Sequence, residues 1–283
     1  DVSGTDSPFR ETSNIYDGYD SRTKITKYNN ETGLIGSGTY RKGMYLGEIW
    51  GYVTDRLYQA SDFDDNGKLK EGMPRVEGYT PKPGDVLYKD MDGNGIINNG
   101  TLTTSDPGDR TIIGNSTRRY QYGINGGVDW NGFSLSFILQ GVGKRDLWLM
   151  NELTYPIYDP WSTLYSNQLD YWTPERTDAF YPRLYKESAG NTKANTLTQT
   201  RYLLNGAYLT IKNITLTYAL PRTWLKHIGL SRAAVFVSGE NLCTFDHLPK
   251  GVDAERVVTS DYGSRGFTYP YMRQFSFGVN VTL

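Results

Sequence analysis

Residues 119–139 read RYQYGINGGVDWNGFSLSFIL, and this stretch decides the fold class. Asn131-Gly132 lies between two segments in which apolar and polar residues alternate. Both positions of such a two-residue turn need a residue that tolerates a positive φ, which Asn and Gly do. Across the turn, Trp130 lies opposite Phe133, so the apolar side chains of both segments share one face. The stretch therefore predicts a β-hairpin with one apolar and one polar face.

The last nine residues alternate in the same way. Small or polar residues separate five apolar ones, which are Phe275, Phe277, Val279, Val281 and Leu283. Alternation at period two over a whole segment is typical of a strand with one buried or lipid-facing side. The sequence therefore predicts a strand that continues to the C-terminus.

Further alternation predicts five strands in total. The parity of the apolar residues changes near Lys212-Asn213, which indicates a β-bulge, and Pro221 ends that strand. The predicted strands cover residues 118–130, 133–145, 205–220, 232–244 and 269–283.

Composition excludes several classes of protein. The chain has 283 residues, a formal net charge of -1, one Cys and two His. This balance gives no electrostatic footprint for nucleic acid. So few Cys and His exclude a disulfide framework and leave little material for a zinc site. No run approaches the ~20 apolar residues of a membrane helix, but a membrane-spanning strand needs only ~9–11 residues with alternate ones apolar.

The strand pattern alone fits a soluble β-sandwich and a membrane β-barrel about equally. Long polar stretches at 29–117, 146–204 and 245–268 alternate with short turns, and this asymmetry favours the barrel. We therefore predict an all-β fold: the C-terminal part of a large antiparallel transmembrane β-barrel with short periplasmic turns and long extracellular loops. Residues 1–28 would end a preceding strand region. Trp130 and Phe133 would lie in the aromatic belt at the membrane interface.

Six motifs follow one another along the chain: GDVLYKDMDGNG (84–95), DRTIIG (109–114), YWTPE (171–175), YPR (181–183), AYLTIKNITL (207–216) and SGENL (238–242). Together they resemble the motifs of one known family, the SusC/RagA-like TonB-dependent outer-membrane transporters of Bacteroidota. Thr210 stands where that family usually has Arg, Ala254 replaces a Pro, and Leu283 replaces a terminal Phe.

The resemblance implies a plugged barrel of the ~22-strand class that imports oligosaccharides or oligopeptides and has no enzymatic activity. Its partners would be a SusD-like surface lipoprotein, the TonB energising complex, the remainder of its own barrel and outer-membrane lipid. A dimer of transporter–lipoprotein pairs is also implied. The chain would lie in the outer membrane of a Gram-negative bacterium, with its C-terminus periplasmic and its last strand serving as the assembly signal. No plug domain is recognisable in it.

One loop has the spacing of a calcium ligand set. Asp90, Asp92 and Asn94 offer side-chain oxygens at the first positions of an EF-hand-like loop, and Ile96 would offer its backbone carbonyl. The acid expected at the twelfth position is missing, and Asp106 or Asp109 could replace it. The alternative is an Asx-rich turn that holds itself through side-chain-to-backbone hydrogen bonds. Calcium is thus the only cofactor candidate.

Loop aromatics are the weak candidates for substrate binding. Trp161, Tyr165 and Trp172 could stack on sugar rings, but packing within the loops is the simpler interpretation. No residues suggest a catalytic site. Besides the transporter, we therefore keep a soluble secreted β-sandwich that binds glycans and carries structural calcium. A surface glycoside hydrolase ranks last, because no carboxylate pair stands out.

Overall fold

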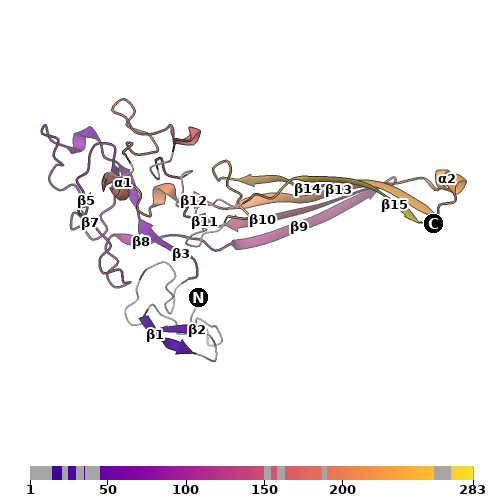
Figure 1. Ribbon diagram of the computed structural model, residues 1–283, viewed down its shortest axis with the longest axis horizontal. Coiled ribbons are helices and arrows are strands. Elements are labelled where there is room, and N and C mark those ends of the chain that lie inside the picture. Colours follow the sequence, from indigo (N-terminus) through magenta and orange to yellow (C-terminus); the bar gives the residue numbers. More distant parts are fainter. Residues whose placement is uncertain are drawn as a thin grey trace. The chain divides into compact units, whose positions relative to one another are not determined.

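The structure is a computed structural model that describes residues 15–20, 25–29, 35, 45–149, 154–157, 163–186, 190–257 and 269–282. The chain forms two compact units. Unit 1 contains Asp1–Thr117 and Leu147–Leu203, and unit 2 contains Arg118–Asp146 and Leu204–Leu283. Figure 1 shows the elements of both units.

Unit 2 is one antiparallel sheet with the strand order β15-β14-β13-β10-β9. The strands lie in chain order across the sheet (Figure 1), although a long segment, residues 145–207, separates β10 from its neighbour β13 in the sequence. The strands are β9 (Arg119–Trp130), β10 (Phe133–Lys144), β13 (Tyr208–Ala219), β14 (Arg232–Asp246) and β15 (Gln274–Thr282).

Three strand ends differ from the sequence prediction by two residues or more, and hydrogen bonds explain two of them. β13 begins at Tyr208 and not at 205, because the Asn205 side chain accepts the backbone N–H of Ala207 and turns the chain there. β15 begins at Gln274 and not at 269. Before it, Pro270 has no N–H to donate, and Tyr271 donates its N–H to Asp253. β14 continues to residue 246 because its end pairs with the start of β13.

The hairpin of β9 and β10 has the tight turn that its sequence favours. Asn131 and Gly132 have φ values of 47° and 87°, and Trp130 pairs with Phe133. Farther along, Gly126 lies opposite Phe137. A Cβ on that glycine would meet the ring at 2.7 Å, so the aromatic ring occupies the space that a side chain would need.

Both ladders of β13 contain an irregularity near the predicted bulge. The register with β10 shifts between Ile138 and Leu139, where Lys212 is the extra residue. The register with β14 shifts between Ile211 and Asn213. Asn241, on the β14 side of that shift, has a φ of 49°. The bulges bring two polar residues together, because Lys212 Nζ donates to Asn241 Oδ1 at 3.1 Å.

Unit 1 consists of short strands and single helical turns. β3 pairs with β8, β4 with β6, β5 with β7 in parallel, and β1 with β2. Its strands are β1 (Ile15–Asp20), β2 (Ile25–Asn29), β3 (Glu48–Tyr52), β4 (Thr54–Leu57), β5 (Arg75–Val76), β6 (Val86–Tyr88), β7 (Ile96–Ile97) and β8 (Arg110–Asn115). The helical turns are η1 (Ala60–Asp62), η2 (Ser166–Gln168), α1 (Gly190–Asn195) and η3 (Thr200–Tyr202). The remaining elements are β11 (Asp146–Leu147), β12 (Leu204–Asn205), α2 (Arg222–Leu225) and η4 (Lys226–Ile228).

The two long stretches that the sequence assigns to separate loops, 29–117 and 146–204, interleave in unit 1. Their shared core includes Val86, Tyr88 and Trp172. The backbone N–H of Val86 donates to Asn195 Oδ1 at 2.8 Å, and the Tyr88 hydroxyl donates to the carbonyl of Ala194 at 2.6 Å. Both bonds join residues more than 100 positions apart, so these stretches are a packed unit. In the part of the chain described, no helix is long and apolar enough to cross a membrane.

Candidate functional site

The sheet of unit 2 has one apolar face that is exposed. Cross-strand pairs place its side chains together, because residues directly opposite each other point to the same side. Phe277 is 91% exposed and pairs with Val237, which pairs in turn with Leu216. The exposed members of this face include Tyr122, Ile124, Val128, Trp130, Phe133, Leu135, Leu216, Val235, Val237, Phe245, Phe275, Phe277, Val279 and Val281.

The opposite face is polar and makes hydrogen bonds between strands. The Ser238 hydroxyl bonds with Thr215 Oγ1 at 2.8 Å and accepts from Asn213 Nδ2 at 3.0 Å. Phe236 and Ile138 are apolar exceptions; the ring of Phe236 lies over Gly278, and Ile138 lies between Asn125 and Asn213 on the neighbouring strands. The other members of this face include Asp129, Ser134, Ser136, Gln140, Thr217, Glu240, Ser276 and Asn280.

An apolar face of this extent needs an apolar surrounding. Monomeric soluble proteins rarely expose contiguous apolar patches larger than a few hundred Å². The two outer strands, β9 and β15, also have no further strand partner among the described residues. An unpaired edge in lipid would leave backbone polar groups unsatisfied, so a sheet of this kind placed in lipid would need further strands on both sides.

The predicted interface aromatics lie beside the β9–β10 turn, at one end of the apolar face. Trp130 is 74% exposed, and Phe133 is the first residue of β10. The ring of Phe133 lies 4.5 Å from that of Tyr218 on β13. Of the predicted C-terminal set, Phe275, Phe277, Val279 and Val281 lie in β15 on the apolar face, whereas Leu283 lies outside the described residues. Their role in assembly stays a prediction.

At the other end of the sheet, the segment 252–257 is held against the strands by three cations. Lys212 Nζ lies 2.6 Å from Glu255 Oε2, and both side chains are largely buried. The guanidinium of Arg118 donates to the Glu255 carbonyl at 2.6 Å, and that of Arg145 donates to the carbonyls of Ala254 and Val257. These cations come from β13 and from the ends of β9 and β10, so the segment joins three strands.

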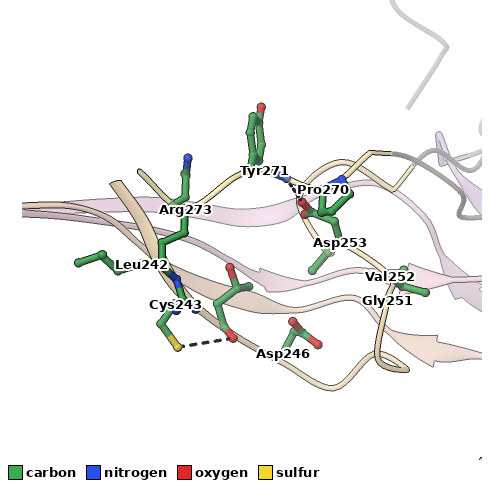
Figure 2. A pocket seen from close by; sticks show the side chains of 12 residues that line it. Leu242, Cys243, Asp246, Gly251, Val252, Asp253, Pro270, Tyr271 and Arg273 are labelled. Carbon is green, nitrogen blue, oxygen red and sulfur yellow. Dashed lines mark hydrogen bonds between the residues drawn. The ribbon is translucent and has the colours of Figure 1, made fainter. Parts of the chain in front are cut away.

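A pocket of about 420 Å³ lies between this segment and the end of β14 (Figure 2). Asp253 lines it but does not offer a free carboxylate. Its oxygens accept the backbone N–H groups of Glu255, Arg256 and Tyr271. The ring of Tyr271 also lies under Lys212 Nζ, 4.4 Å from its centroid. The carboxylate of Asp253 thus holds the wall of the pocket together through backbone hydrogen bonds.

The predicted calcium loop brings three carboxylates together. Oxygens of Asp90, Asp92 and Asp109 lie within 4.8 Å of one another. Asp109 is the residue that could replace the missing twelfth-position acid. Each carboxylate also accepts backbone N–H groups; Asp90, for example, accepts those of Gly93 and Gly95 at 2.7 Å. The carbonyl of Ile96 accepts a 3.4 Å bond from the Asn98 side chain. The geometry is therefore that of an Asx-rich turn, and calcium binding stays a prediction.

We expect calcium to increase the hydrogen-exchange protection of residues 90–98. Burial raises the pKa of the Asp109 carboxyl, and the nearby charges of Asp92 and Asp90 raise it further. Hydrogen bonds from the backbone N–H groups of Asn98 and Met91 lower the pKa, but the net shift is upward. A divalent cation would relieve this repulsion. The change Asp92→Asn should remove the calcium effect, and magnesium serves as the control ion. If calcium leaves the wild-type exchange rates unchanged, the loop is held by its own hydrogen bonds alone.

The three candidate stacking residues lie in different surroundings. Trp172 is 6% exposed and packs in the core of unit 1, where Arg183 lies 5.6 Å from its ring centroid. Tyr165 is 38% exposed, and Trp161 lies outside the described residues. A buried Trp172 presents no face to a sugar, so its position favours the packing interpretation.

Sequence reasoning missed a buried polar network in unit 1. The Asp85 carboxylate accepts from Asn195 Nδ2 at 2.9 Å and from Asn191 Nδ2 at 2.6 Å. Gln199, which has no exposed surface, donates to the Tyr88 hydroxyl at 3.0 Å. Buried polar groups of this kind need partners. In the sequence, the network is visible only as a stretch with Asn and Gln residues at 191–199. A solvated loop would have the same composition, so the stretch does not indicate burial.

Asp62 and Arg56 form a charged pair in unit 1. The guanidinium of Arg56 donates to both carboxylate oxygens, at 2.6 and 2.8 Å, and the Gln59 N–H adds a third bond. The bond from Arg56 is the main reason why the pKa of Asp62 is lowered. A lowered pKa in the folded state stabilises the fold above the unfolded-state pKa, and this is lost as the pH falls through the folded-state pKa.

Replacing Asp62 with Asn should therefore destabilise unit 1 by about 1–2 kcal/mol at neutral pH. The loss is smaller than for a fully buried pair, because Arg56 is partly exposed to solvent. The variant should also lose less stability than the wild type below about pH 4. Hydrogen exchange of residues 54–63, corrected for the intrinsic rate at each pH, measures both effects. Asp65→Asn, at an exposed carboxylate, is the matched control. Equal pH profiles for wild type and Asp62→Asn would contradict the expectation.

Comparison with known proteins gives a consistent group of relatives. The chain is 29% identical over 250 residues to TonB-dependent receptor P3 of Formosa agariphila, a match that covers 85% of the chain and 22% of that receptor. It is 24% identical over 205 residues to TonB-dependent receptor P26 of the same organism, covering 70% of the chain and 20% of the receptor. No family model matches.

Among solved structures, the RagAB peptide transporter matches with a TM-score of 0.55 and 17% identity, over 88% of this chain and 23% of that one. The RagAB peptide importer in its open-open state matches with a TM-score of 0.54 and 18% identity, over 86% and 23%. The resemblance to SusC/RagA-like TonB-dependent transporters is confirmed. The all-β fold, a sheet that corresponds to part of a transporter barrel, is confirmed with it. The chain spans about a fifth of the length of the curated relatives.

Proposed function

We propose that this chain is the C-terminal barrel segment of a TonB-dependent outer-membrane importer of oligosaccharides or oligopeptides. The importer would work with a SusD-like surface lipoprotein, and TonB would act on a part of the protein outside this segment. The loops would be extracellular and the C-terminus periplasmic. The segment would have no chemistry of its own.

The observation that carries the proposal is the two-faced sheet. More than a dozen large apolar side chains on one face are exposed, and the other face carries hydrogen-bonded Ser, Thr and Asn residues. A β-barrel in lipid needs this division, with apolar residues outward and polar residues toward the lumen. The names of the relatives, TonB-dependent receptors and a peptide importer, support the same function.

The same relatives support a transport role over an enzymatic one. The receptors and the importer are named for binding and uptake. RagAB is a peptide importer, which favours oligopeptides as the substrate class, but at 17–18% identity the likeness to it extends to the fold alone. Oligosaccharides and oligopeptides therefore both stay in the proposal.

The test is the behaviour of the full-length protein in detergent. Outer-membrane fractions are solubilised and run on one gel, boiled and unboiled, with detection by an antibody against residues 45–117. We expect a boiled band far above 32.0 kDa and a shifted unboiled band, because a closed barrel resists unfolding by detergent in the cold.

A water-soluble 32.0 kDa species without a heat shift would contradict the proposal. It would support instead the secreted β-sandwich that binds glycans. Uptake assays with labelled oligopeptides and oligosaccharides, in cells with and without the gene, then separate the two substrate classes.

A further inference from the structure

The connection between β13 and β14 carries basic and aromatic side chains and no acidic one. Residues 221–232 read PRTWLKHIGLSR, without Asp or Glu. Arg222, Lys226 and Arg232 are exposed, and Trp224 is 63% exposed. An exposed Trp among three cations, on a connection of this length, is not explained by the packing of the sheet.

This connection is fixed to the strand ends. Leu225 is buried, and Gly229, with a φ of 73°, ends η4. The backbone N–H and the hydroxyl of Ser231 both donate to the carbonyl of Thr282 at 3.0 Å. The exposed side chains of 222–226 are therefore presented from an ordered turn.

The connection lies at the same end of the sheet as the interface aromatics. The N–H of Ala219, the last residue of β13, donates to the carbonyl of Gly132 at 2.8 Å. Gly132 belongs to the turn that separates Trp130 from Phe133. The apolar face thus ends in an aromatic group beside the β9–β10 turn, and the connection that contains α2 (Arg222–Leu225) lies at the same end of the sheet (Figure 1).

The cations of this connection have no acidic partner in the described part of the chain. None of Arg222, Lys226 and Arg232 takes part in an ion pair there. The carboxylate at this end, Asp129, belongs to the polar face and accepts a hydrogen bond from the Ser134 hydroxyl. Among the described residues, no carboxylate therefore neutralises the positive charge beside the apolar face.

We propose that residues 222–232 bind the anionic headgroups of phospholipids in the leaflet that this end of the sheet meets. The cations would contact the phosphate groups, while Trp224 would lie at the level of the headgroups beside Trp130. This inference rests on the proposed membrane function. It assigns the connection a preference for one class of lipid, which a barrel does not need in order to insert.

The test uses the full-length protein in nanodiscs that contain equal amounts of phosphatidylcholine and phosphatidylglycerol. Native mass spectrometry counts the lipids that stay bound to the protein after release from the disc. We expect phosphatidylglycerol to be retained preferentially. The triple variant R222Q/K226Q/R232Q should retain it at least about fivefold less, and W224A should retain less of both lipids.

The control is K68Q/K82Q/K89Q, which removes the same charge from three exposed lysines of unit 1. It should keep the wild-type preference. Equal retention of the two lipids by the wild type, or equal losses in both triple variants, would overturn the inference. Displacement of phosphatidylglycerol by excess inorganic phosphate would also overturn it, because the site would then be one for phosphate and not for lipid.

These outcomes are separate from failure of the proposed function. A protein that does not enter nanodiscs and shows no heat-shifted band fails as a barrel. A protein that enters them and shows the shift, but retains both lipids equally, keeps the barrel and loses the lipid preference.

Discussion

Replacing Phe277 with Arg should prevent the full-length protein from accumulating as a folded outer-membrane species. Phe277 lies in the middle of β15 on the apolar face and is 91% exposed. In water, an exposed Phe contributes little, and Arg would be tolerated or would increase solubility. In lipid, an outward Arg near the midplane of a β-barrel costs about 2–4 kcal/mol. The heat-shifted band in outer-membrane fractions measures the difference.

Ser276→Arg is the matched control. Ser276 precedes Phe277, lies in the same strand and points to the polar face. The same charge there should leave most of the folded band. Equal effects of the two substitutions would contradict a lipid-facing surface, and a loss confined to Ser276→Arg would reverse the assignment of the two faces.

Replacing Gly84 with Ala should open unit 1, with a loss of about 3–5 kcal/mol in local stability. Gly84 has a φ of +90°, and a Cβ there would overlap the ring of Trp172. That ring cannot move away easily, because Trp172 is buried and its backbone N–H is bonded to the Tyr181 carbonyl at 2.9 Å. Hydrogen exchange of residues 84–88 and 171–174 measures the loss.

Gly72→Ala is the control that separates the cost of the positive φ from the cost of the overlap with Trp172. Gly72 has a similar φ of +83°, but nothing lies within 4 Å of the position that its Cβ would take. It should therefore cost only the penalty for a left-handed backbone, about 1–2 kcal/mol. If both variants lose the same stability, contact with Trp172 does not determine the need for glycine at position 84.

The sheet could be predicted because its signals are local. Asn131-Gly132 and the alternation on both sides place two strands and a turn within some twenty residues, and no distant partner is needed to recognise them. The strand ends were harder to predict. Tyr271 leaves the ladder because its N–H bonds to Asp253, eighteen positions earlier, and no pattern around Tyr271 indicates that bond.

Unit 1 could not be predicted because its contacts join residues that lie even farther apart in the sequence. Its core joins Gly84 to Trp172 and Asp85 to Asn195, and each of these residues looks like part of a polar loop when read alone. The acidic loop is an intermediate case. The spacing of Asp90 and Asp92 indicated their proximity, and Asp109 was one of two possible third members.

The interleaving of the two segments of unit 1 has a consequence for the alignment of β9 with β10 during folding. The hairpin of β9 and β10 separates the two segments of unit 1 in the sequence. The first segment ends at Thr117 and the second begins at Leu147, so the alignment of the two strands affects the distance between these two points. A slip of two residues would keep every apolar side chain on the apolar face, so the pattern of the hairpin alone does not exclude it. The same slip would shift one strand by about 7 Å along the other. The close packing of Trp172 on Gly84 joins the two segments of unit 1 at a fixed distance, so the formation of unit 1 would favour one alignment of the hairpin.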